Sequence, residues 1–290
     1  MSIKIGYQGV AGAYSQAALE KFTKAMSWTP ADMIEENFDD FGTLVEALLE
    51  ERLDYAVIPI ENSTTGLITR SLDLFRGVPI IGTAEVYQEV RHVLWGLEGA
   101  TLDDIKEVYS HPEALSQCER FFKNHPAIRP VSYVDTAKAA KLVKDMGDKT
   151  IAAIASPQAG EIYGLKSILG YLQTEKINTT RFVLASKLKS EAVLKDLMAT
   201  DPSRTRTIFF IKLPHKKGSL ARLLNLFSVF DINLEALNSR PIEDQPFSYG
   251  FFIEVDLSNT GIDLDALWTG LTYVCDKIQI VANLTPENFG

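Results

Sequence analysis

The sequence predicts an α/β protein whose C-terminal part forms a separate, smaller α+β domain. Up to about residue 187, short apolar runs alternate with stretches of helical periodicity, as in open sheets covered by helices. After a polar stretch, residues 205–284 follow the order strand, helix, strand, strand, helix, strand, which is that of a ferredoxin-like sandwich. A chain of 290 residues is long enough for two such domains.

Composition and charge narrow the class of protein. The chain is 46% apolar and 23% charged with a net charge of −9, which is typical of a globular protein and argues against nucleic acid as its main partner. No apolar run reaches the ~20 residues of a membrane span, and the N-terminus lacks the apolar core of a secretory signal. Cys118 and Cys275 form no CxxC pair, as expected of packed thiols in a reducing compartment. We therefore expect a cytoplasmic protein with no nucleic-acid or membrane partner.

The elements of the first part follow from the spacing of apolar residues. Strands are expected at residues 3–7, 55–60, 108–110, 131–134 and 150–155. Helices are expected at residues 41–49, 115–122 and 139–146. Ser156 is a favourable N-cap and Pro157 suits the first helical position, so another helix is expected there.

The alternation stops between residues 187 and 206, where polar and turn-forming residues predict a linker. The strands expected beyond it lie at residues 207–211, 232–237, 248–257 and 278–281, with helices at 220–230 and 264–274. This part is complete as a small domain.

The turn after the first strand has Gly6, Gly9 and Gly12 three residues apart, followed by Ser15. This spacing fits neither the dinucleotide fingerprint nor a P-loop. One interpretation is a backbone that approaches a ligand closely, with Ser15 at a helix N-terminus where N–H groups suit an anion. The other is a tight turn with a helix cap.

A second polar segment follows the strand at residues 55–60 and contains Glu61, Asn62, Ser63 and Thr64. Open α/β sheets bind ligands at the carboxyl ends of their strands, which favours a binding loop. The alternative is a polar loop with an N-cap, although a helix start explains only one or two of these residues.

Two further helix starts carry polar residues. His111 begins the helix that leads to Gln117, and it is either a ligand contact or a cap. Asp135 begins the next helix, and its position favours a structural cap.

The segment before the last strand of the first part holds Asn178, Thr180, Arg181 and Phe182. Arginine offers a fork of donors that matches a carboxylate, and threonine offers a hydroxyl of well-defined direction. The alternative is an edge-strand entry with a surface arginine. No HExxH, GxSxG or metal-ligand cluster is present, so we expect no metal and no cofactor.

Taken together and in this order, these segments resemble the prephenate dehydratase family over nearly the whole chain. The matching segments are Gly6-x-x-Gly9-x-x-Gly12-x-x-Ser15, Glu61-Asn62-Ser63-x-x-Gly66, His111-Pro112-x-x-Leu115-x-Gln117-Cys118, Asp135-Thr136-Ala137 and Asn178-x-Thr180-Arg181-Phe182. Each motif alone is weak, but the ordered set is specific. With no helical domain before Ile3, the chain is similar to the monofunctional form without chorismate mutase.

The resemblance implies a two-lobed, periplasmic-binding-protein-like (type II) catalytic domain at residues 1–188. Lobe one would span about 1–82 and 176–188, lobe two about 83–175, and residues 189–204 would be the linker. The family converts prephenate into phenylpyruvate, water and carbon dioxide in phenylalanine biosynthesis, and its catalytic threonine corresponds to Thr180. The residues expected to bind substrate are Ser15, Glu61, Asn62, Ser63, Thr64, Asn178, Arg181 and Phe182, with His111 and Gln117 as further candidates.

Residues 205–284 resemble an ACT regulatory domain, which implies allosteric inhibition by L-phenylalanine and assembly into a homodimer or homotetramer. The expected effector-site residues are Gly218, Ser219, Leu220, Asn233, Leu234, Asn238, Ser239, Arg240 and Pro241. The family motif begins with glutamate where this chain has Asn238, so the resemblance leaves regulation by phenylalanine open.

Two alternatives to a prephenate dehydratase stay open at this point. The first is an arogenate dehydratase, since arogenate differs from prephenate only by an amino group in place of the keto group. The second is an amino-acid-sensing binding protein without catalysis, against which the absence of a leader and the full polar set at both lobes argue.

Overall fold

The computed structural model describes residues 2–175, 177–189, 194–242, 249–258 and 261–286. Contacts between Cα atoms divide the chain into two compact units, Met1–Thr69 with Val86–Phe182, and Arg70–Glu85 with Val183–Gly290. The division falls inside a strand rather than near residue 188, and residues 70–85 join the second unit. Residue 176 of the expected lobe one, residues 190–193 of the expected linker, and residues 243–248 and 259–260 of the expected C-terminal domain lie outside the described residues.

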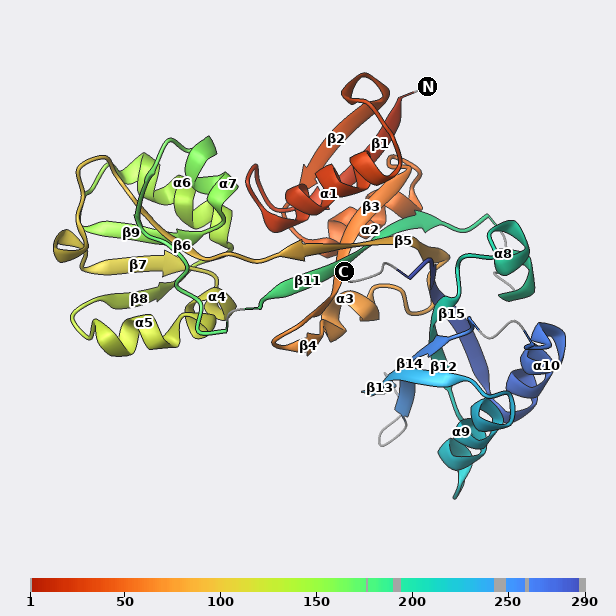
Figure 1. Cartoon of the computed structure of the whole chain (residues 1–290). Coiled ribbons are helices and arrows are strands. Elements are labelled where there is room, and N and C mark those ends of the chain that lie inside the picture. Colours follow the sequence, from red (N-terminus) through yellow and green to blue (C-terminus); the bar gives the residue numbers. More distant parts are fainter. Residues whose placement is uncertain (1, 176, 190–193, 243–248, 259–260, 287–290) are drawn as a thin grey trace. The chain divides into compact units, whose positions relative to one another are not determined.

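The first lobe of the first unit is a sheet with helices packed on it, in which β1 runs parallel to β2 and β3 (Figure 1). Its strands are β1 (Ile3–Gln8), β2 (Met33–Phe38), β3 (Tyr55–Asn62) and β11 (Thr179–Lys187), in the order β11-β3-β1-β2, with the short β4 (Gly66–Leu67) paired to β3. Its helices are α1 (Tyr14–Ala25) and α2 (Phe41–Leu49), with a 3-10 turn at Pro30–Asp32. Leu19, Phe22, Leu44 and Leu48 of the helices are fully buried, so apolar helix faces hold this lobe together.

The second lobe contains a mixed sheet in the order β10-β6-β9-β7-β8, of which Figure 1 labels all strands but β10. Its strands are β6 (Val93–Gly96), β7 (Glu107–Ser110), β8 (Arg129–Ser132), β9 (Ile151–Ala155) and β10 (Lys166–Leu169). Its helices are α4 (Pro112–Gln117), α5 (Glu119–Asn124), α6 (Thr136–Met146) and α7 (Pro157–Ile162), with a 3-10 turn at Leu102–Asp104. The Ser156 side chain caps α7 by accepting from the Ala159 N–H at 3.0 Å, as the sequence predicts.

The second unit contains the expected βαββαβ order. Its sheet runs β13-β14-β12-β15, built from β12 (Arg206–Lys212), β13 (Asn233–Pro241), β14 (Tyr249–Asp256) and β15 (Lys277–Leu284). Helices α9 (Ser219–Val229) and α10 (Leu264–Val274) pack on this sheet through Leu223, Phe227, Leu267 and Leu271. The unit also includes most of α3 (Thr69–Asp73) and the first part of β5 (Ile80–Glu89), in which Gly82 pairs with Ala282 of β15.

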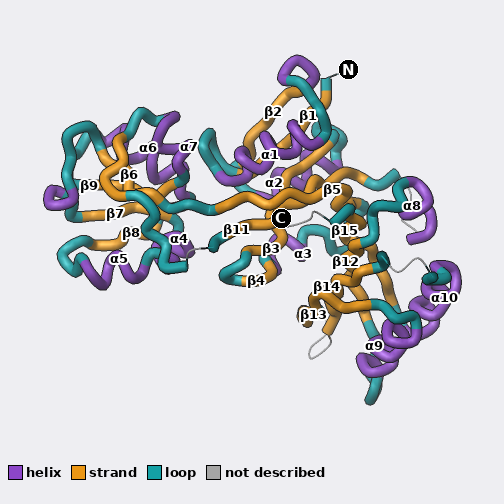
Figure 2. Tube along the Cα trace, in the orientation of Figure 1, coloured by secondary structure: helices purple, strands orange, loops and turns teal. Residues whose placement is uncertain are grey.

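The expected fold class, two α/β lobes followed by an α+β part, is confirmed, and the differences are local. The helix expected at residues 115–122 is two short helices that meet at Cys118. The stretch expected to be a linker contains α8 (Leu194–Thr200). Apolar spacing did not indicate β2, β4, β5 and β6, which are labelled in Figure 2, or the short β10. In the described part of the chain, no helix has the length and apolar character needed to span a bilayer.

Candidate functional site

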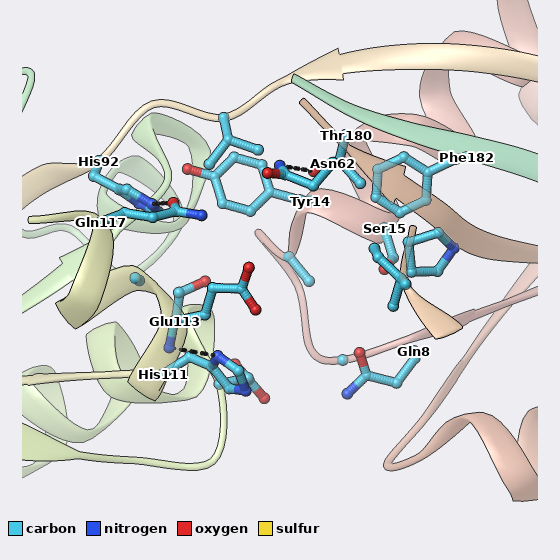
Figure 3. Close-up of a pocket in the computed structure, with 18 of the residues that line it drawn as sticks. Gln8, Tyr14, Ser15, Asn62, His92, His111, Glu113, Gln117, Thr180 and Phe182 are labelled. Atoms are coloured by element: carbon cyan, nitrogen blue, oxygen red, sulfur yellow. Dashed lines mark hydrogen bonds between the residues drawn. The ribbon is translucent and has the colours of Figure 1, made fainter. Parts of the chain in front are cut away.

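A cavity of about 240 Å³ lies between the two lobes of the first unit (Figure 3). The first lobe contributes Gln8, Tyr14, Ser15, Asn62, Thr180 and Phe182, and the second contributes His92, His111, Glu113, Gln117 and Asp135. Apolar side chains, including Phe41, Pro59, Ile68 and Val90, complete the wall. A cavity with an apolar wall and a few convergent polar groups is the usual form of a small-molecule site.

Thr180 faces this cavity because of its place on β11. Side chains alternate across a strand, so Thr180 and Phe182 line the cavity while Arg181 lies on the other face. Arg181 is buried there and pairs with Glu61, with 3.3 Å between Nη1 and Oε2. The arginine expected to hold a substrate carboxylate is therefore placed outside the cavity wall.

Asn62 fixes which way the Thr180 hydroxyl points. The backbone N–H of Thr64 can only donate, and it donates to Asn62 Oδ1 at 3.0 Å. Asn62 Nδ2 is therefore the donor end, and it reaches Asn178 Oδ1 at 2.8 Å and Thr180 Oγ1 at 3.0 Å. Because the Thr180 oxygen accepts, its own hydrogen is available for another acceptor, and among the described residues none takes it.

The same network continues into the second lobe. Asn178 Nδ2 donates to Gln117 Oε1 at 2.7 Å, so the amide nitrogen is the donor end of Gln117. That nitrogen donates one hydrogen to Thr64 Oγ1 at 3.4 Å, and Gln117 lines the cavity. Thr180 and Gln117 thus present donors from opposite lobes to one cavity.

The glycine turn serves two contacts. Gly9 lines the cavity and Gly12 lies against α7, where a Cβ atom would be 2.6 Å from Ala159 Cα. Both have positive φ, 109° and 87°, which favours glycine. The Ser156 hydroxyl donates to the Gly12 carbonyl at 2.7 Å. The turn leads into α1, so that Ser15 and the first backbone N–H groups of that helix border the cavity.

The titratable groups of the wall are histidines, carboxylates and the phenol of Tyr14. Asp135 accepts from the Lys138 N–H at 2.6 Å, as expected of a cap, and burial raises the pKa of its carboxyl. His111 accepts from the Glu113 N–H at 3.3 Å, and Glu113 turns its carboxylate toward the cavity (Figure 3). Burial lowers the pKa of His92. None of the described lining residues is a lysine or arginine.

Most of the residues expected at the site lie close together. Ser15, Asn62, His111, Gln117, Thr180 and Phe182 line the cavity, and Asn178 stands behind it. The expected residues that do not line it are Glu61, Ser63, Thr64 and Arg181. Ser63 instead joins its loop to β11 through Thr179, whose N–H donates to Ser63 Oγ at 3.0 Å.

Sequence reasoning missed Gln8, Tyr14, His92 and Glu113, and it assigned only a cap to Asp135. Glu113 had a usable signal, because it lies two residues after His111 at the same helix start. His92 had none, since it lies in a short connection between strands. No group of three or more His, Cys, Asp or Glu side chains in the described structure is arranged to hold a metal ion.

In the second unit, a cavity of about 280 Å³ includes Ser219 and Leu220 in its wall, and the adjoining Gly218 caps α9 with φ 79°. The other expected effector-site residues, Asn233, Leu234, Asn238, Ser239, Arg240 and Pro241, lie on β13 and do not line it. Arg240 pairs with Asp73, and the Pro241 carbonyl accepts from Arg76.

A sequence profile of the prephenate dehydratase family matches residues 5–190. Arogenate dehydratase/prephenate dehydratase 2 of Arabidopsis thaliana is 32% identical over 267 residues, which cover 88% of this chain and 66% of the relative. A bifunctional chorismate mutase/prephenate dehydratase of Neisseria gonorrhoeae is 30% identical, with coverage of 88% and 66%. This chain thus spans just under two thirds of either relative.

Among solved structures, a prephenate dehydratase from Arthrobacter aurescens in complex with L-Phe superimposes with a TM-score of 0.83 at 24% identity. The alignment covers 98% of this chain and 90% of that one. At this identity, the likeness supports the fold described above.

Proposed function

Because this chain belongs to the prephenate dehydratase family, we propose that it converts prephenate into phenylpyruvate with loss of water and carbon dioxide. The observation that supports this best is the Thr180 hydroxyl. Its oxygen accepts from Asn62 Nδ2, so its hydrogen is left to be donated into the cavity. An oriented donor is what a leaving hydroxyl needs.

The reaction breaks two bonds of the cyclohexadiene ring. The bond between the ring and its carboxylate breaks as carbon dioxide leaves, and its electron pair enters the ring. The ring C4–O bond breaks in turn, and the oxygen takes up one proton and leaves as water. The ring becomes aromatic, which supplies much of the driving force, and no electron is exchanged with another molecule.

Thr180 assists the departure of the oxygen. An alcohol is a poor acid, so the role we assign is to orient and partly transfer its hydrogen to the leaving oxygen. The hydrogen bond from Asn62 Nδ2 stabilises negative charge that develops on Thr180 Oγ1 meanwhile. Gln117, whose amide nitrogen has a second hydrogen besides the one it donates to Thr64 Oγ1, is the second donor near the same place.

The carboxylate that stays on the product needs an anchor. The described cavity wall has no lysine or arginine, and Arg181 is paired with Glu61 outside it. The N-terminus of α1 remains, where backbone N–H groups and Ser15 border the cavity. A helix N-terminus attracts anions, so we place the retained carboxylate there. The ring carboxylate loses its charge in the reaction, which the apolar part of the wall favours.

Arogenate is the second candidate substrate, and Glu113 is the observation that favours it. Arogenate bears an ammonium group where prephenate has a keto group, and Glu113 turns a carboxylate toward the cavity (Figure 3). The relative from Arabidopsis thaliana is named for both activities. We keep prephenate as the principal proposal and arogenate as the alternative.

We further propose that the C-terminal βαββαβ part is an ACT domain that responds to L-phenylalanine. Its strand and helix order fits, and the cavity beside Ser219 and Leu220 is large enough for a small ligand. The neighbour from Arthrobacter aurescens was solved in complex with L-Phe. Titration of the activity with L-phenylalanine is the test, and unchanged activity together with no detectable binding would reject regulation by this amino acid.

The deciding experiment for the activity measures products. Phenylpyruvate formed from prephenate is followed by its ultraviolet absorbance, and phenylalanine formed from arogenate is followed by chromatography. We expect turnover of at least one compound, and the ratio of kcat/KM gives the preferred substrate. If neither is turned over while both bind, the chain is a binding protein and the proposal is wrong.

A further inference from the structure

His92 is a buried side chain at the cavity wall to which the reaction described above gives no role. It lies between β5 and β6 and is 2% exposed. Its backbone is held on both sides, because its N–H donates to Gln173 Oε1 at 3.0 Å and its carbonyl accepts from the Leu172 N–H at 2.9 Å. Its ring nitrogen Nε2 lies 2.7 Å from Gln117 Oε1 (Figure 3).

The direction of donation in the hydrogen-bond network determines the tautomer of the His92 ring. Gln117 Oε1 already accepts from Asn178 Nδ2, so it faces His92 as an acceptor too. His92 Nε2 therefore carries the hydrogen and donates it, and in the neutral ring Nδ1 carries the lone pair. One amide oxygen thus receives two donors, one from each connection between the lobes.

The network has one consistent arrangement because both of its ends are fixed. At one end the backbone N–H of Thr64 holds Asn62 Oδ1. At the other end, a Gln117 amide turned by 180° would place its N–H groups against Asn178 Nδ2, donor against donor. Asn178 cannot turn in response, because it would then present its own donors to Asn62 Nδ2.

We propose that His92 is a positioning residue of the dehydration, which holds Gln117 Oε1 through Nε2–H and so keeps the Gln117 amide nitrogen and the Thr180 hydrogen directed at the substrate. This inference rests on the proposed function of Thr180. His92 acts through Gln117 and need not touch the reacting atoms.

The surroundings of Nδ1 disfavour a proton there. Nδ1 is buried and has no hydrogen-bond partner among the described residues. The titratable groups around the ring are Tyr14 from α1, whose ring lies edge-on with 6.3 Å between the ring centroids, and Glu113 from α4. Tyr14 Oη already donates to the Arg91 carbonyl at 2.6 Å. A proton on Nδ1 would therefore lack an acceptor, and burial lowers the pKa of His92 although the hydrogen bond to Gln117 and the charge of Glu113 raise it. Nε2 carries its hydrogen in either protonation state, so the contact to Gln117 does not depend on that proton.

Three substitutions separate this role from mere packing. In His92→Gln the amide nitrogen reaches the place of Nε2, whereas in His92→Asn it reaches only that of Nδ1, and His92→Leu has no donor. We expect His92→Leu and His92→Asn to lower kcat about 10- to 100-fold with KM within about threefold. His92→Gln should restore most of that loss.

The split between kcat and KM is the second readout. A residue that only directs the Gln117 and Thr180 donors should change kcat and leave KM within about threefold of the wild-type value, whereas a packing defect would change both. Circular dichroism and thermal melting control for folding, and if His92→Leu does not fold, the comparison of Gln with Asn decides.

The role of His92 is rejected if Gln and Asn variants that fold have equal kcat. Failure of the proposed function looks different, because then the wild type itself would turn over neither prephenate nor arogenate. This inference alone is rejected if the wild type is active, Thr180→Ala is inactive and His92→Leu keeps the wild-type kcat.

Discussion

Thr180 is set up to donate because Asn62 Nδ2 already occupies its oxygen. Thr180→Ala removes the donor from a side chain that is 9% exposed, with little change in volume. We expect kcat to fall about 100-fold or more while KM changes by less than about threefold, since the lost bond forms mainly in the transition state. Thr180→Ser keeps the hydroxyl but loses the stiff χ1 of threonine, so its kcat should lie between those of the wild type and Thr180→Ala. Steady-state kinetics with the preferred substrate make the comparison, and wild-type kcat in Thr180→Ala would remove the residue from the mechanism.

Asn62→Asp tests the direction of the same hydrogen bond. The aspartate has the same shape but offers only acceptors, so the Thr180 hydroxyl would donate to residue 62 instead of the substrate. We expect a loss of kcat comparable to that of Thr180→Ala. Because both changes remove one interaction, the double variant should be no slower than the slower single variant. Losses that multiply in the double variant would show that Asn62 acts independently of Thr180.

At the scale of single residues, the sequence indicated the polar side chains of the site but not His92, which contacts Gln117. Asn62, Gln117 and Thr180 stood in polar segments at strand ends or helix starts, where ligand sites are common. Arg181 was expected at the substrate but lies outside the cavity wall, because it is adjacent to Thr180 on a strand and so faces the other way. His92 was not predictable, because its contact with Gln117 depends on how two connections between the lobes lie beside each other.

Among the elements, the turn before α1 links the lobes through Gly12. A Cβ at Gly12 would meet the backbone of Ala159 in α7, and φ is 87° there. Gly147 in the second lobe is a matched control, since its φ is 65° and a Cβ atom added there would meet nothing within 4 Å. We expect Gly147→Ala to cost about 1 kcal/mol from backbone strain alone, and Gly12→Ala to cost about 2–4 kcal/mol because overpacking is added.

Activity separates the two glycine variants further. The displaced turn of Gly12→Ala carries Ser15 and the N-terminus of α1, so kcat/KM should fall at least about tenfold. Gly147 ends α6 away from the cavity wall, and its variant should keep the wild-type kcat/KM. Urea unfolding and steady-state kinetics measure the two effects. Equal losses of stability in the two variants would show that the contact with α7 is unimportant.

The elements that apolar spacing missed have identifiable physical causes. β2 is largely exposed, with the sequence MIEENF, so it has no buried face to create a pattern. β6 and β10 are only four residues each, too short to show a period. The single helix expected at residues 115–122 keeps helical apolar spacing across Cys118, where the structure has a C-cap for α4 and the start of α5.

For the whole molecule, the sequence indicated the number of parts but not where they divide. A continuous boundary near residue 188 follows from composition, whereas the second compact unit takes in residues 70–85. Within that unit, Arg206 pairs with Glu85 at 3.2 Å and Arg240 pairs with Asp73. Contacts between residues so far apart in the chain leave no local sequence pattern. The assignment of residues 70–85 to the second unit could therefore not be predicted from the sequence.

The stability of the whole molecule should depend on pH through His92. Its pKa in the folded state lies below the ordinary 6.5, so folding favours the neutral ring. The resulting loss in the free energy of unfolding is absent above pH 6.5. It grows as the pH falls through that value, and it becomes constant below the folded-state pKa of His92. Acidification from pH 7.5 to 5.0 should therefore destabilise the wild type, by about 1.4 kcal/mol for each unit by which the pKa is depressed.

His92→Gln isolates this contribution, because the carboxylates that also titrate in this range are shared with the wild type. Asp135 acts in the opposite sense: burial raises its pKa above 3.8, so acidification relieves a buried charge and offsets part of the loss from His92. This offset is common to both proteins and cancels when they are compared. Urea unfolding at the two pH values should show a smaller loss of stability in His92→Gln than in the wild type. Equal losses would mean that the pKa of His92 is the same in the folded protein as in the unfolded chain.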